Sequence, residues 1–177
     1  MPTGIYDHLT GSEVSISQDH TYIHQGKAYE LSYYTASLAA AATEYLSFTT
    51  PQLLGGKVIH FRPTSLSSYA NAASITITEG AVMTGGTAAT PRNCDRMKPD
   101  ASLVTIATAA TLSTAGIAII YNDSVGSGGA RNRSGGAGGG AENERILKPE
   151  TTYSIAFKNI GASTATVVYY NIFWYEE

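Results

Sequence analysis

Cysteine is almost absent from this sequence: Cys94 is the only one among 177 residues. No disulfide can therefore form within the chain, so packing, a metal or oligomerisation must stabilise the fold. A lone thiol also fits folding in a reducing cytoplasm. Charge is sparse too, with 14% Asp, Glu, Lys and Arg and a formal net charge of -3. Because no run of Lys or Arg is present, the sequence argues against binding to a nucleic-acid backbone.

Long apolar runs are missing as well. No stretch reaches the length of a membrane span, and residues 1–8 have neither the basic nor the apolar region of an export signal. We therefore expect no membrane association and no export. A chain of 177 residues suits one domain that can bury a sizeable core.

Signatures of catalysis and of cofactor binding are also lacking. In the glycine-rich stretch 122–144, Arg131 stands where a dinucleotide fingerprint needs its third glycine, and the Gly-Lys-Ser/Thr ending of a phosphate loop is absent. Cys94 and His60 could form a thiolate pair, but nothing around Cys94 matches a nucleophile signature. The sequence predicts no enzymatic activity, no catalytic residue and no cofactor.

Histidines and loop carboxylates are the remaining candidates for chemistry. His20 and His24 stand four apart on an expected strand, share a face, and together with His60 raise the question of zinc. No cysteine or carboxylate stands at ligand spacing, so we predict no metal site. The loop carboxylates could supply a glycosidase pair, but no aromatic cluster near them could hold a sugar, and solvated charges are the better interpretation. They are Asp95, Asp100, Glu142 and Glu144.

Residues 145–177 carry the strongest pattern, a strand, a turn and a second strand. In residues 152–160, Tyr153, Ile155 and Phe157 fall on one side, the period of two of a half-buried strand. In residues 165–175 both sides are apolar. One side can face the second sheet of a sandwich, whereas the other needs a loop of the same chain or a neighbouring subunit. We therefore expect Trp174 and Tyr175 to contact a subunit or partner.

Short strand-like runs recur through the middle of the chain, rich in β-branched or aromatic residues and separated by Gly, Pro, Ser or Asn. Their intervals leave no room for crossover helices, so the sheets should be antiparallel. The sequence thus predicts an all-β fold, an antiparallel β-sandwich of the jelly-roll kind. The runs are residues 44–49, 57–62, 74–78, 103–108 and 116–121.

Two local patterns come before these runs. Residues 21–24 and 28–34 alternate around Gln25 and Gly26, which predicts a hairpin. Residues 37–43 contain four consecutive alanines, which predict one or two turns of helix.

The domain boundaries follow from composition. Residues 1–19 are weakly patterned and form a candidate N-terminal arm, and residues 20–177 form a single sandwich domain. Residues 122–144 predict a long flexible loop; alternatively, the loop orders against an acidic partner through Arg131 and Arg133. Tyrosine, with 12 copies, suits interfaces, and Tyr33 joins these arginines as a candidate contact residue.

The order and spacing of several short segments carry a resemblance to a known family. They include a Pro-x-Thr-x-Tyr start of a strand at residues 149–153 and a closing Trp-Tyr-Glu. Over most of its length the chain resembles the head decoration, cement or minor capsid proteins of tailed-phage virions. It departs from the family where Asp95, before Arg96, replaces a second Asn. The segments are residues 23–32, 77–80, 85–87, 93–96, 146–153, 158–159 and 173–177.

This resemblance implies a jelly-roll protein that assembles, often as a trimer, on the outer surface of an icosahedral head. There it would bridge copies of the major capsid protein, after synthesis in the host bacterial cytoplasm. The N-terminal arm is then the candidate element that orders on the capsid. The arm residues proposed for this contact are Ile5, Tyr6, His8, Leu9, Val14 and Ile16.

Two other function classes stay open at this point. A virion protein of the head- or tail-fibre type could bind a carbohydrate or receptor by stacking sugars on Trp174 and neighbouring tyrosines. A small glycan-cleaving enzyme is motivated only by the loop carboxylates.

Overall fold

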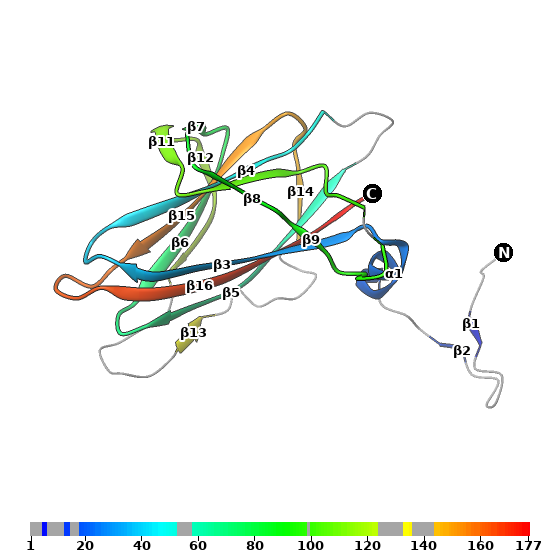
Figure 1. The fold of residues 1–177 in the computed structure, drawn as a ribbon, viewed down its shortest axis with the longest axis horizontal. Helices are drawn as coiled ribbons and strands as arrows, with labels where there is room; N and C mark the ends of the chain where they lie inside the picture. Colours follow the sequence, from blue (N-terminus) through cyan, green and yellow to red (C-terminus); the bar gives the residue numbers. More distant parts are fainter. Residues whose placement is uncertain are drawn as a thin grey trace.

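A computed structural model describes residues 20–52, 58–98, 100–120 and 144–177, except for the side chains of residues 63–65. It also describes the backbone of residues 5–6, 13–14, 18–19, 121–123 and 133–135. This part of the chain is built mainly from antiparallel strands in two packed sheets, which confirms the predicted all-β sandwich (Figure 1). The jelly-roll connectivity stays a prediction.

Two six-stranded sheets form the sandwich. In spatial order, the first sheet contains β12 (Ile117–Asp123), β6 (Ala73–Glu79), β15 (Thr152–Asn159), β4 (Thr43–Thr49), β10 (Thr105–Thr108) and β8 (Thr87–Ala89). The second contains β13 (Arg133–Gly135), β5 (Ile59–Tyr69), β16 (Thr166–Glu176), β3 (Ala28–Leu38) and β9 (Arg92–Asn93), and β14 (Arg145–Leu147) also pairs with β5. Two smaller ladders pair β7 (Val82–Thr84) with β11 (Thr111–Thr114) and β1 (Ile5–Tyr6) with β2 (Glu13–Val14).

Each strand-like run of the sequence overlaps an observed strand, because alternation of apolar and polar residues is a local signal. In β15 the predicted inward residues Tyr153, Ile155 and Phe157 are buried, whereas Lys158 is exposed. The turn that follows is also confirmed. The buried Asn159 amide group donates to three carbonyl oxygens and its Oδ1 accepts from the Gly161 N–H, and the chain then passes from the first sheet to the second.

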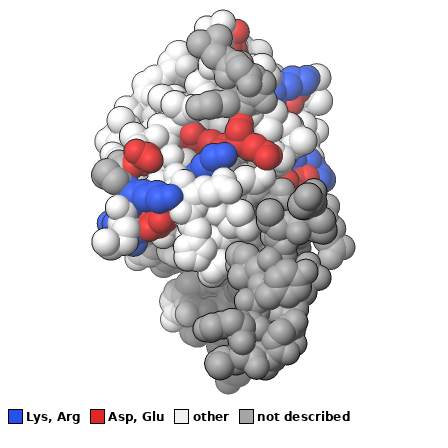
Figure 2. Space-filling model, turned by 90° about the vertical axis from the view of Figure 1, so that its right-hand side faces the viewer, with Lys and Arg blue, Asp and Glu red and all other residues white. Residues whose placement is uncertain are grey.

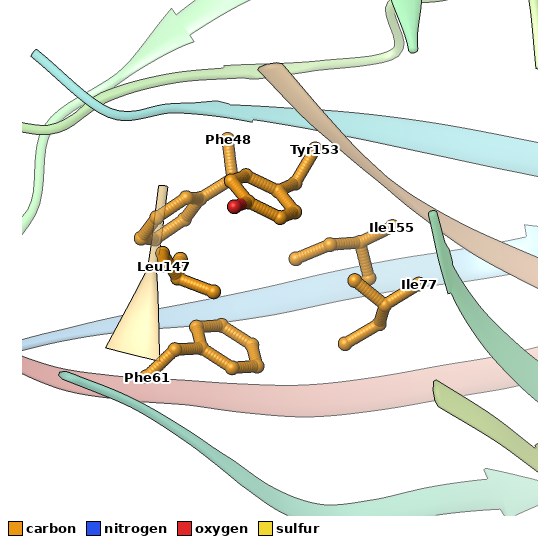
Figure 3. Close-up of a pocket in the computed structure, with 6 residues that line it drawn as sticks. All are labelled: Phe48, Phe61, Ile77, Leu147, Tyr153 and Ile155. Carbon is orange, nitrogen blue, oxygen red and sulfur yellow. The ribbon is translucent and has the colours of Figure 1, made fainter. Parts of the chain in front are cut away.

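Aromatic side chains from both sheets meet in the core. The ring of Phe48 on β4 contacts those of Phe61 and Trp174 on the facing sheet edge-to-face, at 5.5 and 5.3 Å between centroids. Such pairs add about 0.5–1.5 kcal/mol each to the stabilisation from apolar burial. Leu147 lies beside Phe48 and Phe61 in this core (Figure 3). The space between Leu147 and its neighbours is apolar and too narrow for a water molecule; it is lined by Phe48, Phe61, Ile77, Leu147, Tyr153 and Ile155.

The predicted hairpin around Gln25 and Gly26 is wrong, because residues 18–25 form the helix α1 (Gln18–Gln25). Gly26 has a φ of 72°, and its N–H donates to the Ile23 carbonyl while the Lys27 N–H donates to that of Tyr22. This pair of bonds is the Schellman arrangement that ends a helix at a glycine. A four-residue run is too short to separate a period of two from one of 3.6.

The predicted helical turns over residues 37–43 are also wrong. Strand β3 continues to Leu38, β4 begins at Thr43, and the alanines between them form a tight turn with Ala41 at a φ of 55°. The Ala41 N–H donates a hydrogen bond to the Gly161 carbonyl of the neighbouring turn. Alanine favours helix only weakly, and four of them offer no apolar face that a helix could bury.

Candidate interaction surface

The terminal strand β16 is covered on both sides by its own chain. Trp174 is 0% exposed and lies between the sheets, and Tyr175, on the opposite side, is 1% exposed. Helix α1 provides the second cover, because the Tyr22 ring stacks on that of Tyr175 at 4.3 Å. Of the two covers considered for this side, the chain supplies its own, so the prediction that Trp174 and Tyr175 contact a subunit or partner is wrong.

Tyr33, the third aromatic residue predicted as a contact, is buried as well. It is 4% exposed and stacks on Phe157 of the facing sheet, with 4.7 Å between ring centroids. Burial, followed by the nearby Glu44 carboxylate, raises the pKa of its phenol far above the usual value of 10.0. Tyr33 therefore belongs to the core, and none of the three aromatic residues is available to a partner.

A ring stack continues from Tyr175 to β5. The His60 ring lies on the other face of Tyr175, at 4.5 Å and nearly parallel. His60 Nδ1 is 2.6 Å from Glu144 Oε1, and its Nε2 is 3.3 Å from Glu177 Oε2 in an ion-pair contact without hydrogen-bond geometry. Glu144 directly precedes β14, so this contact fastens the end of the glycine-rich stretch to the sandwich. It also corrects the interpretation of Glu144 as a solvated loop charge.

This contact should make stability sensitive to acid. Burial raises the pKa of Glu144, but hydrogen bonds from Tyr175 and His60 and the charges of His60 and Arg62 outweigh it and hold the pKa below 4.5. Since the folded-state pKa is depressed, the carboxylate stabilises the fold above about pH 4.5 and loses this effect as the pH falls through the folded-state pKa. We expect the free energy of unfolding to fall less between about pH 5 and pH 3 in Glu144→Gln than in the wild type. Parallel pH profiles in urea denaturation would contradict this.

Glu176 organises the opposite side of β16, and sequence reasoning missed it. Its buried carboxylate accepts hydrogen bonds from Trp174 Nε1 at 3.1 Å, from Ser102 Oγ at 2.6 Å and from the Leu103 N–H at 3.1 Å. It thereby ties the loop before β10 to β16. Its place in an apolar strand was a possible signal, because a carboxylate buried there must find several donors.

The other predicted contact residues are only partly placed. Ile5 pairs with Val14 in the β1–β2 ladder, in which Tyr6 pairs with Glu13. Arg133 lies opposite Ser68 where β13 pairs with β5. His8, Leu9, Ile16, Arg131 and Glu142 lie outside the described residues, as does most of the predicted loop 122–144.

Three exposed tyrosines form the surface that the sequence did not single out, here called the tyrosine face: Tyr34, Tyr69 and Tyr169. They are 62%, 42% and 44% exposed. Tyr34 on β3 lies directly opposite Tyr169 on β16, and Tyr69 on β5 pairs with Val167, two residues from Tyr169. The three rings therefore project from adjacent strands on the outer side of the second sheet.

Polar but uncharged groups accompany these rings. The Tyr169 hydroxyl donates to Ser32 Oγ at 3.4 Å, and Ser32 Oγ donates to Asn171 Oδ1 at 3.0 Å. Among the side chains that the structure describes, none in these rows is charged, which suits a contact made by aromatic area and hydrogen bonds. The outward residues of the rows are Ser32, Tyr34, Ser67, Tyr69, Val167, Tyr169 and Asn171.

The end of the molecule that carries α1 and the C-terminus looks different. Figure 2 shows acidic and basic side chains next to one another there, without an extended basic patch.

Burial, followed by the Glu30 charge, raises the pKa of the Cys94 thiol to about 11, so Cys94 is protonated at neutral pH. Asp95 supports a turn, because its carboxylate accepts from the Met97 N–H at 3.0 Å.

Within the described residues, no group of three or more His, Cys, Asp or Glu side chains is arranged to hold a metal ion. Nor does the described part of the chain contain a helix long and apolar enough to cross a membrane.

Comparisons with protein-family models, curated proteins and solved structures find no match.

Proposed function

We propose that the protein is a structural component of a phage virion that binds the outer surface of the capsid and bridges capsid subunits. The observation that carries the proposal is the uncharged tyrosine face, an aromatic surface that one chain leaves uncovered. Exposed clusters of aromatic residues are typical of protein-contact sites. The resemblance of the sequence to head decoration proteins supplies the partner.

Such a protein acts through binding alone. Contacts with several capsid subunits at once give avidity beyond that of each contact, because the second contact forms within an existing complex. Binding to the assembled shell but not to its separated subunits stabilises the shell by mass action. The trimeric state and the jelly-roll connectivity belong to the same proposal, and a trimer contact would involve residues other than Trp174 and Tyr175.

The N-terminal arm is the second proposed contact. Strands β1 and β2 pair with each other and with no other described strand. An isolated two-stranded ladder is marginally stable in water, so it gains most by docking against a partner surface. We expect removal of residues 1–17 to weaken capsid binding while leaving the sandwich folded, since β3 to β16 form both large sheets without them.

Co-sedimentation with expanded heads of the phage that encodes the protein tests the proposal. The wild type should pellet with the heads, and Tyr34→Ser/Tyr169→Ser should bind at least about tenfold more weakly, since aromatic anchors dominate such contacts. The matched control is Ile117→Ser, which removes an exposed apolar side chain from the other sheet and should bind normally.

Two results would count against the proposal in different ways. If the wild type does not bind the heads, the capsid role is wrong. If it binds and the tyrosine double variant binds equally well, the role stands but the tyrosine face is not the contact.

The tyrosine face also supports a second candidate function, binding of an uncharged carbohydrate. Tyrosine rings with neighbouring Ser and Asn groups offer both stacking area and hydrogen bonds to sugar hydroxyls. Trp174, first considered for this role, is buried and cannot stack on a ligand. Hits on a glycan array that Tyr34→Ser/Tyr169→Ser abolishes would favour this function, and a blank array would end it.

A further inference from the structure

Helix α1 brings two histidines together in a way that a strand would not. His20 and His24 stand four residues apart, so they occupy one face of the helix, and both side chains are exposed. Their Nε2 atoms are 2.9 Å apart, within hydrogen-bond distance of each other, with ring centroids at 4.5 Å and an interplanar angle of 75°. His60 is elsewhere, in the ring stack against Tyr175.

The helix that carries this pair is fixed at several points. Tyr22, on the opposite face, is buried against Tyr175, and the Schellman bonds close the C-terminal end. Beyond the helix, Asn93 Nδ2 donates to the Gly26 carbonyl at 2.8 Å, and Lys98 Nζ donates to that of His24 at 2.5 Å. A short helix alone would fray, but these contacts keep the helix formed and the two histidines one turn apart.

The separation of the two nitrogens fits a shared metal ion. Metal–imidazole bonds are about 2.0–2.1 Å long, so two nitrogens about 2.9 Å apart subtend an angle of about 90° at the metal. That angle belongs to neighbouring positions of square-planar or octahedral coordination, the geometries of Cu²⁺ and Ni²⁺. A tetrahedral Zn²⁺ ion would need a separation of about 3.3 Å.

We propose that His20 and His24 form a two-histidine chelate for a divalent transition metal of the Cu²⁺ or Ni²⁺ class, with water in the other coordination positions. Both imidazoles bind through Nε2 in the neutral form. The chelate goes beyond the proposed capsid role and depends on neither the tyrosine face nor the arm. A bound metal would also stabilise helix α1, because the metal binds only when the two rings are one helical turn apart.

Isothermal titration of the full, untagged chain with Ni²⁺ at about pH 7.5 tests the assignment. We expect saturable binding of one ion per chain and a rise in melting temperature that a chelator reverses. Either His20→Gln or His24→Gln should weaken binding at least about tenfold, because the second imidazole otherwise binds intramolecularly at high effective concentration.

The matched control keeps the number of histidines but changes their spacing. The double variant His24→Gln/Gln25→His separates the rings by five residues, places them on different faces, and should bind no better than His24→Gln. No saturable binding by the wild type up to about 1 mM Ni²⁺ would overturn the proposal. So would binding that survives loss of His20 or His24, or that depends on His8 or His60.

Discussion

Replacing Trp174 with alanine is expected to lower the free energy of unfolding by about 3–5 kcal/mol, the usual cost of truncating a large buried aromatic residue. Trp174 is fully buried, packs edge-to-face on Phe48 at 5.3 Å and stacks near Tyr29 at 6.0 Å. The substitution removes these contacts and leaves a cavity between the two sheets.

Urea denaturation measures this loss, and Tyr169→Ala is the matched control on the same strand. Tyr169 points outward and is partly exposed, so its loss should cost less than about 1 kcal/mol. Equal effects of the two substitutions would contradict the place of Trp174 in the core. A Trp174→Ala effect that grows with protein concentration would mean that Trp174 is at a subunit contact instead.

Glu176→Ala is expected to lower the free energy of unfolding by about 2–4 kcal/mol. The change leaves the buried indole N–H of Trp174 without its acceptor and releases Ser102 and the Leu103 N–H from β16. Each buried donor that loses its acceptor costs about 1–3 kcal/mol.

Glu177→Ala provides a closely matched control. Glu177 is the neighbouring residue of the same type, but it is about half exposed and its side chain contacts His60 at 3.3 Å. A half-exposed carboxylate with one contact that lacks hydrogen-bond geometry contributes about 0–1 kcal/mol. If the two substitutions had the same effect in urea denaturation, the carboxylate of Glu176 would not have the organising role assigned to it.

The sequence predicted the strands well because their signal is local. Alternation in residues 152–160 and in the short runs before them places side chains on two sides of a strand without knowledge of its neighbours. The turn between the last two strands was recognised for the same reason. The structure adds the three carbonyl oxygens to which the Asn159 amide group donates hydrogen bonds.

Prediction failed where a distant residue decides the outcome. The apolar outer side of β16 was recognised, but its cover comes from Tyr22 and His60, more than a hundred residues away in sequence. Whether Tyr22 lies on a helix depends on the cap at Gly26 and on packing against Tyr175, which a four-residue run does not reveal. The sequence therefore left a cover from the same chain and a cover from a subunit as alternatives, and the packing of α1 decides between them.

The tyrosine face was hidden by the same limitation. Val167, Tyr169, Phe173 and Tyr175 share the outer side of β16, one of the two sides that the sequence showed to be apolar. Helix α1 covers the Tyr175 end and leaves Tyr169 exposed beside Tyr34 and Tyr69, so only the packing shows which end can meet a partner.

One chain encloses Trp174 and Tyr175, and among the described residues the tyrosine face is the aromatic surface left for a partner. Trp174 is the only tryptophan, so fluorescence excited at wavelengths that tyrosine does not absorb reports on its surroundings alone. Emission and acrylamide quenching should be followed over a dilution series, with sedimentation velocity to record when single chains are reached. Because Trp174 is enclosed by its own chain, we expect blue-shifted emission and weak quenching at every concentration. A red shift with stronger quenching as oligomers dissociate would contradict it.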